Sequence, residues 1–541
     1  MQYVLVILLA LPIIGAALCA SAALRAVKWV ALGTSLAAVV AGAVLFWGYF
    51  DSGAEQFDVS LGSIDAIGFE FKLGIDSISL WLVGLTLFLQ PLAIAASFQS
   101  IRERQREYHG WMLLLLGAMI GVFVARDALL FYIFFELTLV PMFFIIGVWG
   151  GPQRRYAAGK FFLFTFAGSV FTLAAIIYLG VKAGTFDLGR VVATGSRLSG
   201  PALVWVSLGL LIGFAVKVPL FPLHTWLPLA HTEAPTAGSV ILAAVLLKLG
   251  AYGILRFALP IGFVRTETGV PALRWLIILV GVICLIGILY GALAAWVQQD
   301  IKKLVAYSSV SHLGFCILGL AALNYEGLQG SVLYMVNHGL STGAMFLVVG
   351  MIYDRYHTRD IGELSGLGQR MPILAFFFGL FVLSSIGLPG LNGFVSEFLT
   401  ILGAFKSHYL GKAFGAIAAL GVILSALYML HVTARVIFGP LKFPQAADES
   451  HHPSHDAAVP GELPQDLGKR EIAILVPLAL AVVLLGVVPS VLLDSIEKSA
   501  EQLIGKVDKA APVTDATALR PAAPNGPNGS KAAAAEDNGS D

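Results

Sequence analysis

The feature of this chain that most constrains its fold is a series of apolar runs, most of about 18 residues or more, separated by short polar segments. A helix of that length crosses the ~30 Å hydrocarbon core of a bilayer. The runs are continuous, whereas the strands of a membrane barrel alternate apolar and polar residues, so helices are expected. The runs lie at about 3–21, 29–50, 75–98, 110–125, 128–149, 160–181, 203–230, 235–257, 273–294, 302–322, 328–353, 373–406, 413–437 and 472–493.

The composition agrees with this pattern. The chain is 58% hydrophobic and 12% charged, whereas soluble globular proteins carry about 25% charged residues. We therefore predict an all-α polytopic membrane protein with about 14 transmembrane helices, surrounded by lipid. The first run is not expected to be a removable signal, because MQYVLVILLALPIIG has no basic segment and no small-residue cleavage site.

Lysine and arginine residues gather in the odd-numbered loops. The first loop carries Arg25 and Lys28, the third carries RERQRE and the fifth carries QRRYAAGK, whereas the second loop is mainly acidic. Short cytoplasmic loops are rich in lysine and arginine. The odd-numbered loops are therefore expected in the cytoplasm, and both termini on the other side of the membrane.

The chain offers little for binding a cofactor. Cys19, Cys284 and Cys316 are isolated, so neither an iron–sulfur cluster nor a structural zinc site is expected. No G-x-G-x-x-G or G-x-x-x-x-G-K-[ST] motif for nucleotide binding occurs. The loop HHPSHD has metal-binding residue types, but a solvated histidine-rich loop is the favoured interpretation. From about Val507 the chain is rich in Ala, Pro, Asn and Gly and is expected to be disordered.

Six ionisable side chains interrupt the apolar runs. An ionisable group inside a membrane helix is costly and by default marks an ion pathway. Any one of the six could be a structural ion pair or a snorkelling side chain. However, all six can hold or release a proton, and arginine, which cannot, is absent from the middle of these runs. We interpret the set as a proton relay: Glu136, Lys217, Lys248, His312, His338 and Glu397.

Two long runs contain helix-breaking residues. KVPLFP interrupts the seventh run and GLPGLNG the twelfth, each with an ionisable residue nearby. Proline removes a backbone donor, and unwound backbone at membrane depth must be buried or line a cavity. The breaks are five helices apart, so helices 4–8 (residues 110–257) and 9–13 (residues 273–437) are expected to be inverted repeats. Residues 1–109 would form helices 1–3, residues 438–495 a loop and helix 14, and residues 507–541 the tail.

The break in the seventh run suggests a role for Lys217. Polar backbone and water can reach the lysine there, inside the membrane. A carboxylate close to an ammonium group favours its charged form. Movement of Glu136 toward or away from Lys217 would therefore decide whether the lysine holds its proton.

Three strings identify a family. LHTWLPLAHTEAPTAGSVILAAVLLKLGAYGILRF, DIKKLVAYSSVSHLGF and FELTLVPMFFIIGVWGGPQRRYAAGKFFLFTFAGS closely resemble the chain M family of antiporter-like membrane subunits of bacterial NADH–quinone oxidoreductase, respiratory complex I. The mitochondrial equivalent is subunit 4. The resemblance covers about residues 75–440. It implies 14 helices, inverted five-helix repeats and one proton channel per subunit.

The resemblance also implies a role for each buried ionisable residue. Glu136 matches the key glutamate on the family's fifth helix, and Lys217 matches the lysine on its broken seventh helix. Lys248 matches the central lysine of the eighth helix. His312 and His338 match the histidines of the tenth and eleventh helices.

Glu397 separates this chain from its siblings. It matches the exit residue on the family's broken twelfth helix, where other antiporter-like subunits usually have lysine. His224 and His231 also fit the family pattern near the seventh helix, although an ordinary structural role explains both at least as well. The family commonly has LPDAH where this chain has LPLAH, so Leu229 removes a carboxylate to which a proton-uptake role would be assigned.

We therefore expect a proton-translocating membrane subunit of NADH–quinone oxidoreductase in the bacterial cytoplasmic membrane. The chain itself would hold no cofactor and no metal. The resemblance places flavin, iron–sulfur clusters, NADH and quinone in partner subunits, and makes neighbouring antiporter-like subunits, not nucleic acid, its partners. A subunit of a multi-subunit sodium/proton antiporter is the alternative, but Glu397 and AHTEAPTAGSVILA favour complex I. A passive membrane scaffold would not explain the protonatable groups.

Overall fold

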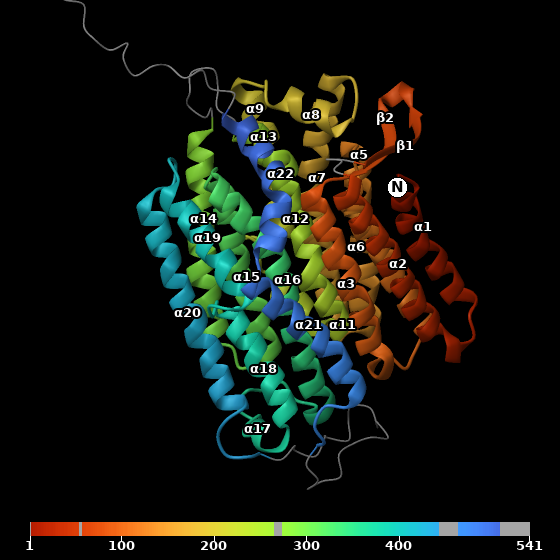
Figure 1. The fold of residues 1–541 in the computed structure, drawn as a ribbon, viewed down its shortest axis with the longest axis vertical. Helices are drawn as coiled ribbons and strands as arrows, with labels where there is room; N and C mark the ends of the chain where they lie inside the picture. The colour runs from red at the N-terminus through yellow and green to blue at the C-terminus, as the bar shows by residue number, and fades with distance from the viewer. Residues whose placement is uncertain (1, 53–56, 264–272, 443–463, 509–541) are drawn as a thin grey trace, which may run out of the picture.

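The computed structural model describes residues 2–52, 57–263, 273–442 and 464–508, which form a bundle of long helices. Figure 1 shows α1 and α2 at one edge of the bundle and α20 at the opposite edge. In this described part of the chain, 13 helices are long and apolar enough to cross a membrane, and one shorter apolar helix adds to them. The prediction of an all-α polytopic membrane protein is confirmed.

Most helices of the first half occupy the expected runs, and a β-hairpin and α8 (Leu188–Gly195) lie between the runs. The elements of this half are α1 (Gln2–Ser21), α2 (Leu24–Ser52), β1 (Phe57–Ile64), η1 (Asp65–Ile67), β2 (Phe69–Ile75), α3 (Ser77–Ser100), α4 (Gln105–Val124), α5 (Ala128–Leu137), α6 (Leu139–Trp149), α7 (Arg154–Ala183), α8 (Leu188–Gly195), α9 (Gly200–Lys217), α10 (Leu227–Glu233), α11 (Thr236–Ile241), η2 (Leu242–Leu246), α12 (Leu247–Gly253), η3 (Ile254–Ala258) and α13 (Leu259–Gly262).

The second half continues the bundle. It contains α14 (Arg274–Trp296), α15 (Ile301–Ala321), α16 (Tyr325–Tyr356), α17 (Leu367–Arg370), α18 (Pro372–Ser385), α19 (Asn392–Lys406), α20 (Lys412–Val436), α21 (Lys469–Val487) and α22 (Ser490–Asp508). The eighth and eleventh spans, α11–α13 and α16, lie in the interior with other helices around them. Both carry residues of the predicted relay.

A β-hairpin fills part of the acidic second loop, where the sequence predicted no regular element. β1 and β2 pair antiparallel, with Ile64 opposite Phe69 and Gly68 in the left-handed conformation at the turn. Lys72 of β2 lies 3.0 Å from the carboxylate of Asp187, which caps α8. Burial opposes the charge on Lys72, but the hydrogen bond and ion pair with Asp187 raise its pKa overall. This contact fixes the hairpin to the bundle.

A buried ion cluster lies where α3 begins. Asp76 caps α3 by accepting a hydrogen bond from the Ser79 backbone N–H, and its carboxylate contacts Arg256 at 2.5 Å and Arg126 at 3.3 Å. Burial alone would raise the pKa of Asp76, but the two arginines and the backbone N–H hold it well below its usual range. The carboxylate therefore joins α3, the start of α5 and the end of the eighth span.

The end of the helical region differs from the prediction. A single span was expected over 472–493, but α21 ends at Val487, and α22 begins after Pro489, which lacks the backbone N–H that would continue the hydrogen bonding of α21. α22 is amphipathic: Leu492, Ile496 and Ala500 repeat every four residues and are fully buried. The tail was expected from 507, yet α22 reaches Asp508; the rest of the tail and the HHPSHD loop lie outside the described residues.

Asp76→Asn is expected to lower the free energy of unfolding by ~3–5 kcal/mol, because it leaves two buried arginines without their counter-charge. Denaturant unfolding of the purified protein in detergent measures this. Asp65→Asn is the control, since Asp65 is exposed in the turn of the neighbouring hairpin. Equal losses of stability in the two variants would contradict the role given to Asp76.

Candidate functional site

Lys248 lies between two π-helical segments of the eighth span. Its helix α12 follows η2 and precedes η3, although the sequence predicted one regular helix here. π-Helical turns are rare and frequently occur at functional sites. The side chain of Lys248 is fully buried, and its Nζ donates a hydrogen bond to the backbone carbonyl of Ala243 in η2 at 2.6 Å.

His338 of α16 is the side-chain partner of Lys248. Its Nδ1 lies 2.6 Å from Lys248 Nζ. A protonated lysine can only donate, so Nδ1 accepts whenever Lys248 carries its proton. His338 Nε2 is buried without a hydrogen-bond partner among the described residues. The ring of His312 lies next, with its centroid 5.7 Å from that of His338.

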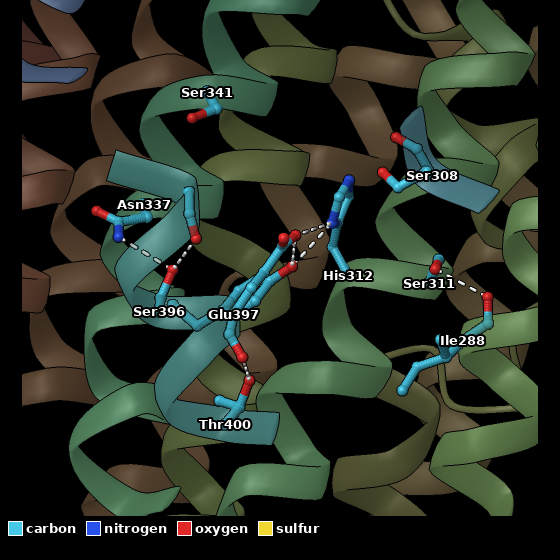
Figure 2. Close-up of polar contacts among 12 residues, drawn as sticks. Ile288, Ser308, Ser311, His312, Asn337, Ser341, Ser396, Glu397 and Thr400 are labelled. Atoms are coloured by element: carbon cyan, nitrogen blue, oxygen red, sulfur yellow. Dashed lines mark hydrogen bonds and ion pairs between the residues drawn. The ribbon is translucent and has the colours of Figure 1, made fainter. Parts of the chain in front are cut away.

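Tyr334 joins His312 to Glu397. Its hydroxyl lies 2.8 Å from His312 Nδ1 and donates to Glu397 Oε1 at 3.0 Å. His312 Nδ1 itself is 3.6 Å from Glu397 Oε1, which is too far for a direct hydrogen bond. Figure 2 shows His312 and the Glu397 carboxylate pointing toward each other from two different helices. All three side chains are buried, so this group of polar contacts lies inside the bundle.

The wall beside Glu397 is built from small polar side chains. A cavity of about 20 Å³ is bordered by His338, His312 and Glu397 and by the polar residues of α16, α18 and α19. Its volume is enough for about one water molecule. The wall itself is hydrogen-bonded: Ser341 contacts Ser384 at 2.6 Å, and Ser384 donates to Asn392 at 2.5 Å. Between α18 and α19, residues 386–391 are not helical.

Glu136 and Lys217 lie near each other without forming an ion pair. Lys217 is the last residue of α9; its Nζ donates to Thr138 Oγ1 at 3.2 Å and lies 4.9 Å from the centre of the Phe135 ring. In the described part of the chain, no carboxylate oxygen is within 4.0 Å of it. Glu136 Oε1 is buried without a hydrogen-bond partner there, and Ser169 lies beside the carboxyl group. Thr138 separates α5 from α6, so Lys217 contacts the point where this span is interrupted.

The two accessory histidines occupy different surroundings. His224 packs against the rings of Phe221 and Tyr290, with centroid distances of 5.7 Å and 5.1 Å. His231 is fully buried and stacks on Phe346 at 4.6 Å, and neither of its ring nitrogens has a hydrogen-bond partner in the described residues. Neither histidine contacts the six predicted relay residues through a described hydrogen bond.

The structure therefore brings four of the six predicted residues into one row of contacts. Lys248, His338, His312 and Glu397 follow one another, whereas Glu136 and Lys217 lie together in the other half of the molecule. No described hydrogen bond joins the two groups.

Sequence reasoning missed three hydroxyl groups of the site. Tyr334 lies four residues before His338, on the same face of α16, and that spacing could have revealed it. Tyr428 of α20 lies 3.5 Å from His312 Nε2. Thr138 accepts a hydrogen bond from Lys217. It follows Glu136 by two residues in an otherwise apolar run, and no spacing in the sequence points to its role.

Two family models match the chain. Residues 125–427 match the model described as NADH:quinone oxidoreductase/Mrp antiporter, TM, and residues 59–124 match NADH-ubiquinone oxidoreductase chain 4, amino terminus. The chain is 42% identical over 522 residues to NADH-quinone oxidoreductase subunit M of Rhodobacter capsulatus, covering 93% of this chain and 97% of that one. It is 40% identical over 489 residues to NADH-ubiquinone oxidoreductase chain 4 of Marchantia polymorpha, covering 90% and 93%.

Solved structures share the fold. A chain of respiratory complex I from Thermus thermophilus with bound NADH is 30% identical, with a TM-score of 0.81 over 93% of this chain and 99% of that one. A chain of the Mrp complex from Dietzia sp. has a TM-score of 0.79 over 94% and 99%. That second chain is 21% identical, so it shows a likeness of fold alone.

Tyr334→Phe is expected to slow proton transfer between His312 and Glu397 about tenfold or more, because it removes a hydrogen bond between potentially charged groups worth ~1.5–3 kcal/mol. The measurement is the rate of proton translocation in sealed vesicles that hold the assembled membrane complex. Tyr428→Phe is the matched control, since that hydroxyl makes a longer contact with the other nitrogen of His312. If both variants translocate protons at the wild-type rate, Tyr334 is not part of the path.

Proposed function

The chain belongs to the family of membrane subunits shared by NADH:quinone oxidoreductases and Mrp antiporters, and from this premise we propose that it translocates protons within an NADH–quinone oxidoreductase. Relatives named as subunits of that enzyme align over most of their length, 97% in Rhodobacter capsulatus and 85% in Rickettsia typhi. The Mrp likeness is one of fold at lower identity, so the antiporter alternative is less well supported. The protein is a multi-pass membrane protein, and we assign it to the bacterial cytoplasmic membrane with both termini on the non-cytoplasmic side.

The redox chemistry belongs to other subunits in this proposal. Flavin, iron–sulfur clusters, NADH and quinone would be bound by partners, and neighbouring antiporter-like subunits would flank this chain. Cys19, Cys284 and Cys316 are buried and unpaired, and no group of three or more possible metal ligands occurs in the ranges that the structure describes. What this chain contributes is a path for protons.

The row of contacts from Lys248 to Glu397 carries this proposal. A proton leaves the Lys248 ammonium for His338 Nδ1 across 2.6 Å. It passes from His338 Nε2 to the ring of His312, where a water in the small cavity or a ring movement completes the step. The Tyr334 hydroxyl then gives its proton to Glu397 and takes one from His312. Each of these groups can both accept and release a proton, as a relay requires.

Glu136 and Lys217 act as the controlling pair in this account. The carboxylate is close enough for its charge to act on Lys217, yet the lysine is hydrogen-bonded to a neutral hydroxyl. A small movement of α5 relative to α9 would exchange Thr138 for Glu136 as its partner. The charged form of the lysine would then be favoured, and its proton would not be passed on until the pair separated.

We further propose that residues 110–257 and 273–437 are two inverted repeats, each with one helix that is broken by several consecutive non-helical residues. The non-helical residues 218–226 between α9 and α10, and 386–391 between α18 and α19, support this assignment. Lys217 lies beside the first interruption, and Glu397 lies in the helix that follows the second. Lys248 would connect the two halves, with Glu397 leading to the outer face.

Glu397→Gln is expected to assemble normally but to lose most proton pumping, because it keeps the shape of the side chain and cannot ionise. NADH–quinone turnover in coupled vesicles should fall with it. Glu397→Asp is the matched variant: it keeps the ionisable group with a shorter reach, so partial activity should remain. Assembly, turnover and proton uptake are measured for both. If the glutamine variant pumps at the wild-type ratio of protons to electrons, Glu397 is a structural hydrogen-bonding group.

A further inference from the structure

Two cavities lie next to each other near the ends of α2 and α3 that face the hairpin. The first has a volume of about 530 Å³; its charged and hydroxyl lining comes mainly from the hairpin, the ion cluster around Asp76 and α22, and α8 adds apolar side chains. The second, of about 320 Å³, is almost entirely apolar and lies between α2, α3, α16 and α21. Val39 and Ala43 of α2, Phe88 of α3 and Leu484 of α21 are among its walls. Neither cavity includes a residue of the proposed relay.

Residues that line the two cavities contact each other directly. Trp81 borders the apolar cavity, and its indole N–H donates to Ser495 Oγ at 2.7 Å, while Ser495 borders the polar one. On α2, Phe46 borders the apolar cavity and Phe50, one turn later, the polar one; their ring centroids are 6.4 Å apart. A polar cavity thus lies next to an apolar one along α2 and α3.

The depth of this junction suits the membrane surface. Tyr49 borders the polar cavity and Trp81 the apolar one, and the side chain of Trp47 on α2 is 76% exposed. Tryptophan and tyrosine are enriched at the level of lipid headgroups. The polar cavity therefore lies at headgroup level, and the apolar cavity extends from it toward the middle of the bilayer.

Charge decides which headgroup fits. The polar cavity is bordered by nearly equal numbers of basic and acidic side chains: Lys72, Arg126, Arg256 and Lys498 against Asp58, Asp76, Asp187, Asp494 and Glu497. An anionic headgroup would lie among more carboxylates than basic groups. A zwitterionic headgroup can pair its phosphate with the basic groups and its cation with the carboxylates. Arg126 forms an ion pair with Asp76 at 3.3 Å, but its Nε and Nη2 make no hydrogen bond to the described residues, so it has N–H groups left to donate to a phosphate. On α22, Asp494 and Lys498 are exposed, one turn apart.

We propose that the two cavities hold one phospholipid with a zwitterionic phosphoethanolamine headgroup. Its phosphate would face Arg126 and Lys498, its ammonium group would face Asp494, and one acyl chain would fill the apolar cavity between α2, α3 and α21. Arginine and lysine are the usual phosphate partners, and carboxylates the usual ammonium partners. The lipid would fill the gap beside α22 and brace that helix against the bundle.

The acyl-chain site is tested with Ala43→Phe, which places a ring in the apolar cavity. Ala37→Phe is the control: it makes the same change on an exposed position of α2 that does not border the cavity. The assembled complex is purified from membranes, and its retained phosphatidylethanolamine, phosphatidylglycerol and cardiolipin are counted by mass spectrometry. Ala43→Phe should lose one phosphatidylethanolamine molecule per complex relative to wild type and Ala37→Phe. Unchanged lipid content would overturn the proposal, as would loss of an anionic lipid instead.

The headgroup assignment has its own test, which also holds if Ala43→Phe fails to assemble. Asp494→Asn and Lys498→Gln should each reduce retention of phosphatidylethanolamine about tenfold. An anionic lipid predicts the opposite sign for Asp494→Asn, which would then increase retention. A photo-crosslinking residue at position 43 that captures a neighbouring subunit instead of lipid would show that protein fills the cavity, and would also overturn the proposal.

Discussion

The structure depends on how the bundle accommodates a lysine that is fully buried at the centre of the membrane-spanning region. A charged side chain at that depth costs ~2.5–3.5 kcal/mol on insertion scales. Lys248 has no carboxylate within 4.0 Å in the described part of the chain; it has a backbone carbonyl in a π-helical segment and the nitrogen of a histidine. Both partners accept from a charged lysine, but only the histidine can take its proton. The π-helical segment that supplies the carbonyl therefore holds Lys248 in place next to the histidine that begins the row of proton-transfer contacts.

A second set of buried charges shows the contrast. Near the hairpin, Asp76 is held between Arg126 and Arg256, groups whose protonation does not change in the physiological range. Such a cluster fixes helices. In the interior, Glu397 meets a tyrosine and a histidine, and Lys217 meets a threonine. The protonatable groups in the interior have weak partners, which suits proton transport. The groups near the hairpin are permanently charged and strongly paired, which suits anchoring of the helices.

The sequence predicted the spans well because lipid imposes long continuous apolar runs, and it pointed to the six ionisable residues because they violate that rule. It could not predict the π-helical segments around Lys248, since no residue pattern marks them. The hairpin, whose strands have 8 and 7 residues, was missed because the acidic second loop was considered only for its charge. Tyr334 was missed because a tyrosine in an apolar helix does not stand out, although its spacing from His338 is informative. α22 was merged with α21 because the two are separated by only two residues. The roles of the six residues and the boundaries of the two repeats stay predictions.

The central claim is that Lys248 exchanges protons with His338 and does not merely supply a positive charge. The direct measurement is the ratio of protons translocated to electrons transferred in vesicles that contain the assembled complex with Lys248→Arg. Arginine keeps the charge but does not release its proton in this range. The account predicts an assembled complex with a ratio well below wild type, as for Lys248→Ala. A near-normal ratio in the arginine variant would contradict it and would show that only the charge at this position is needed.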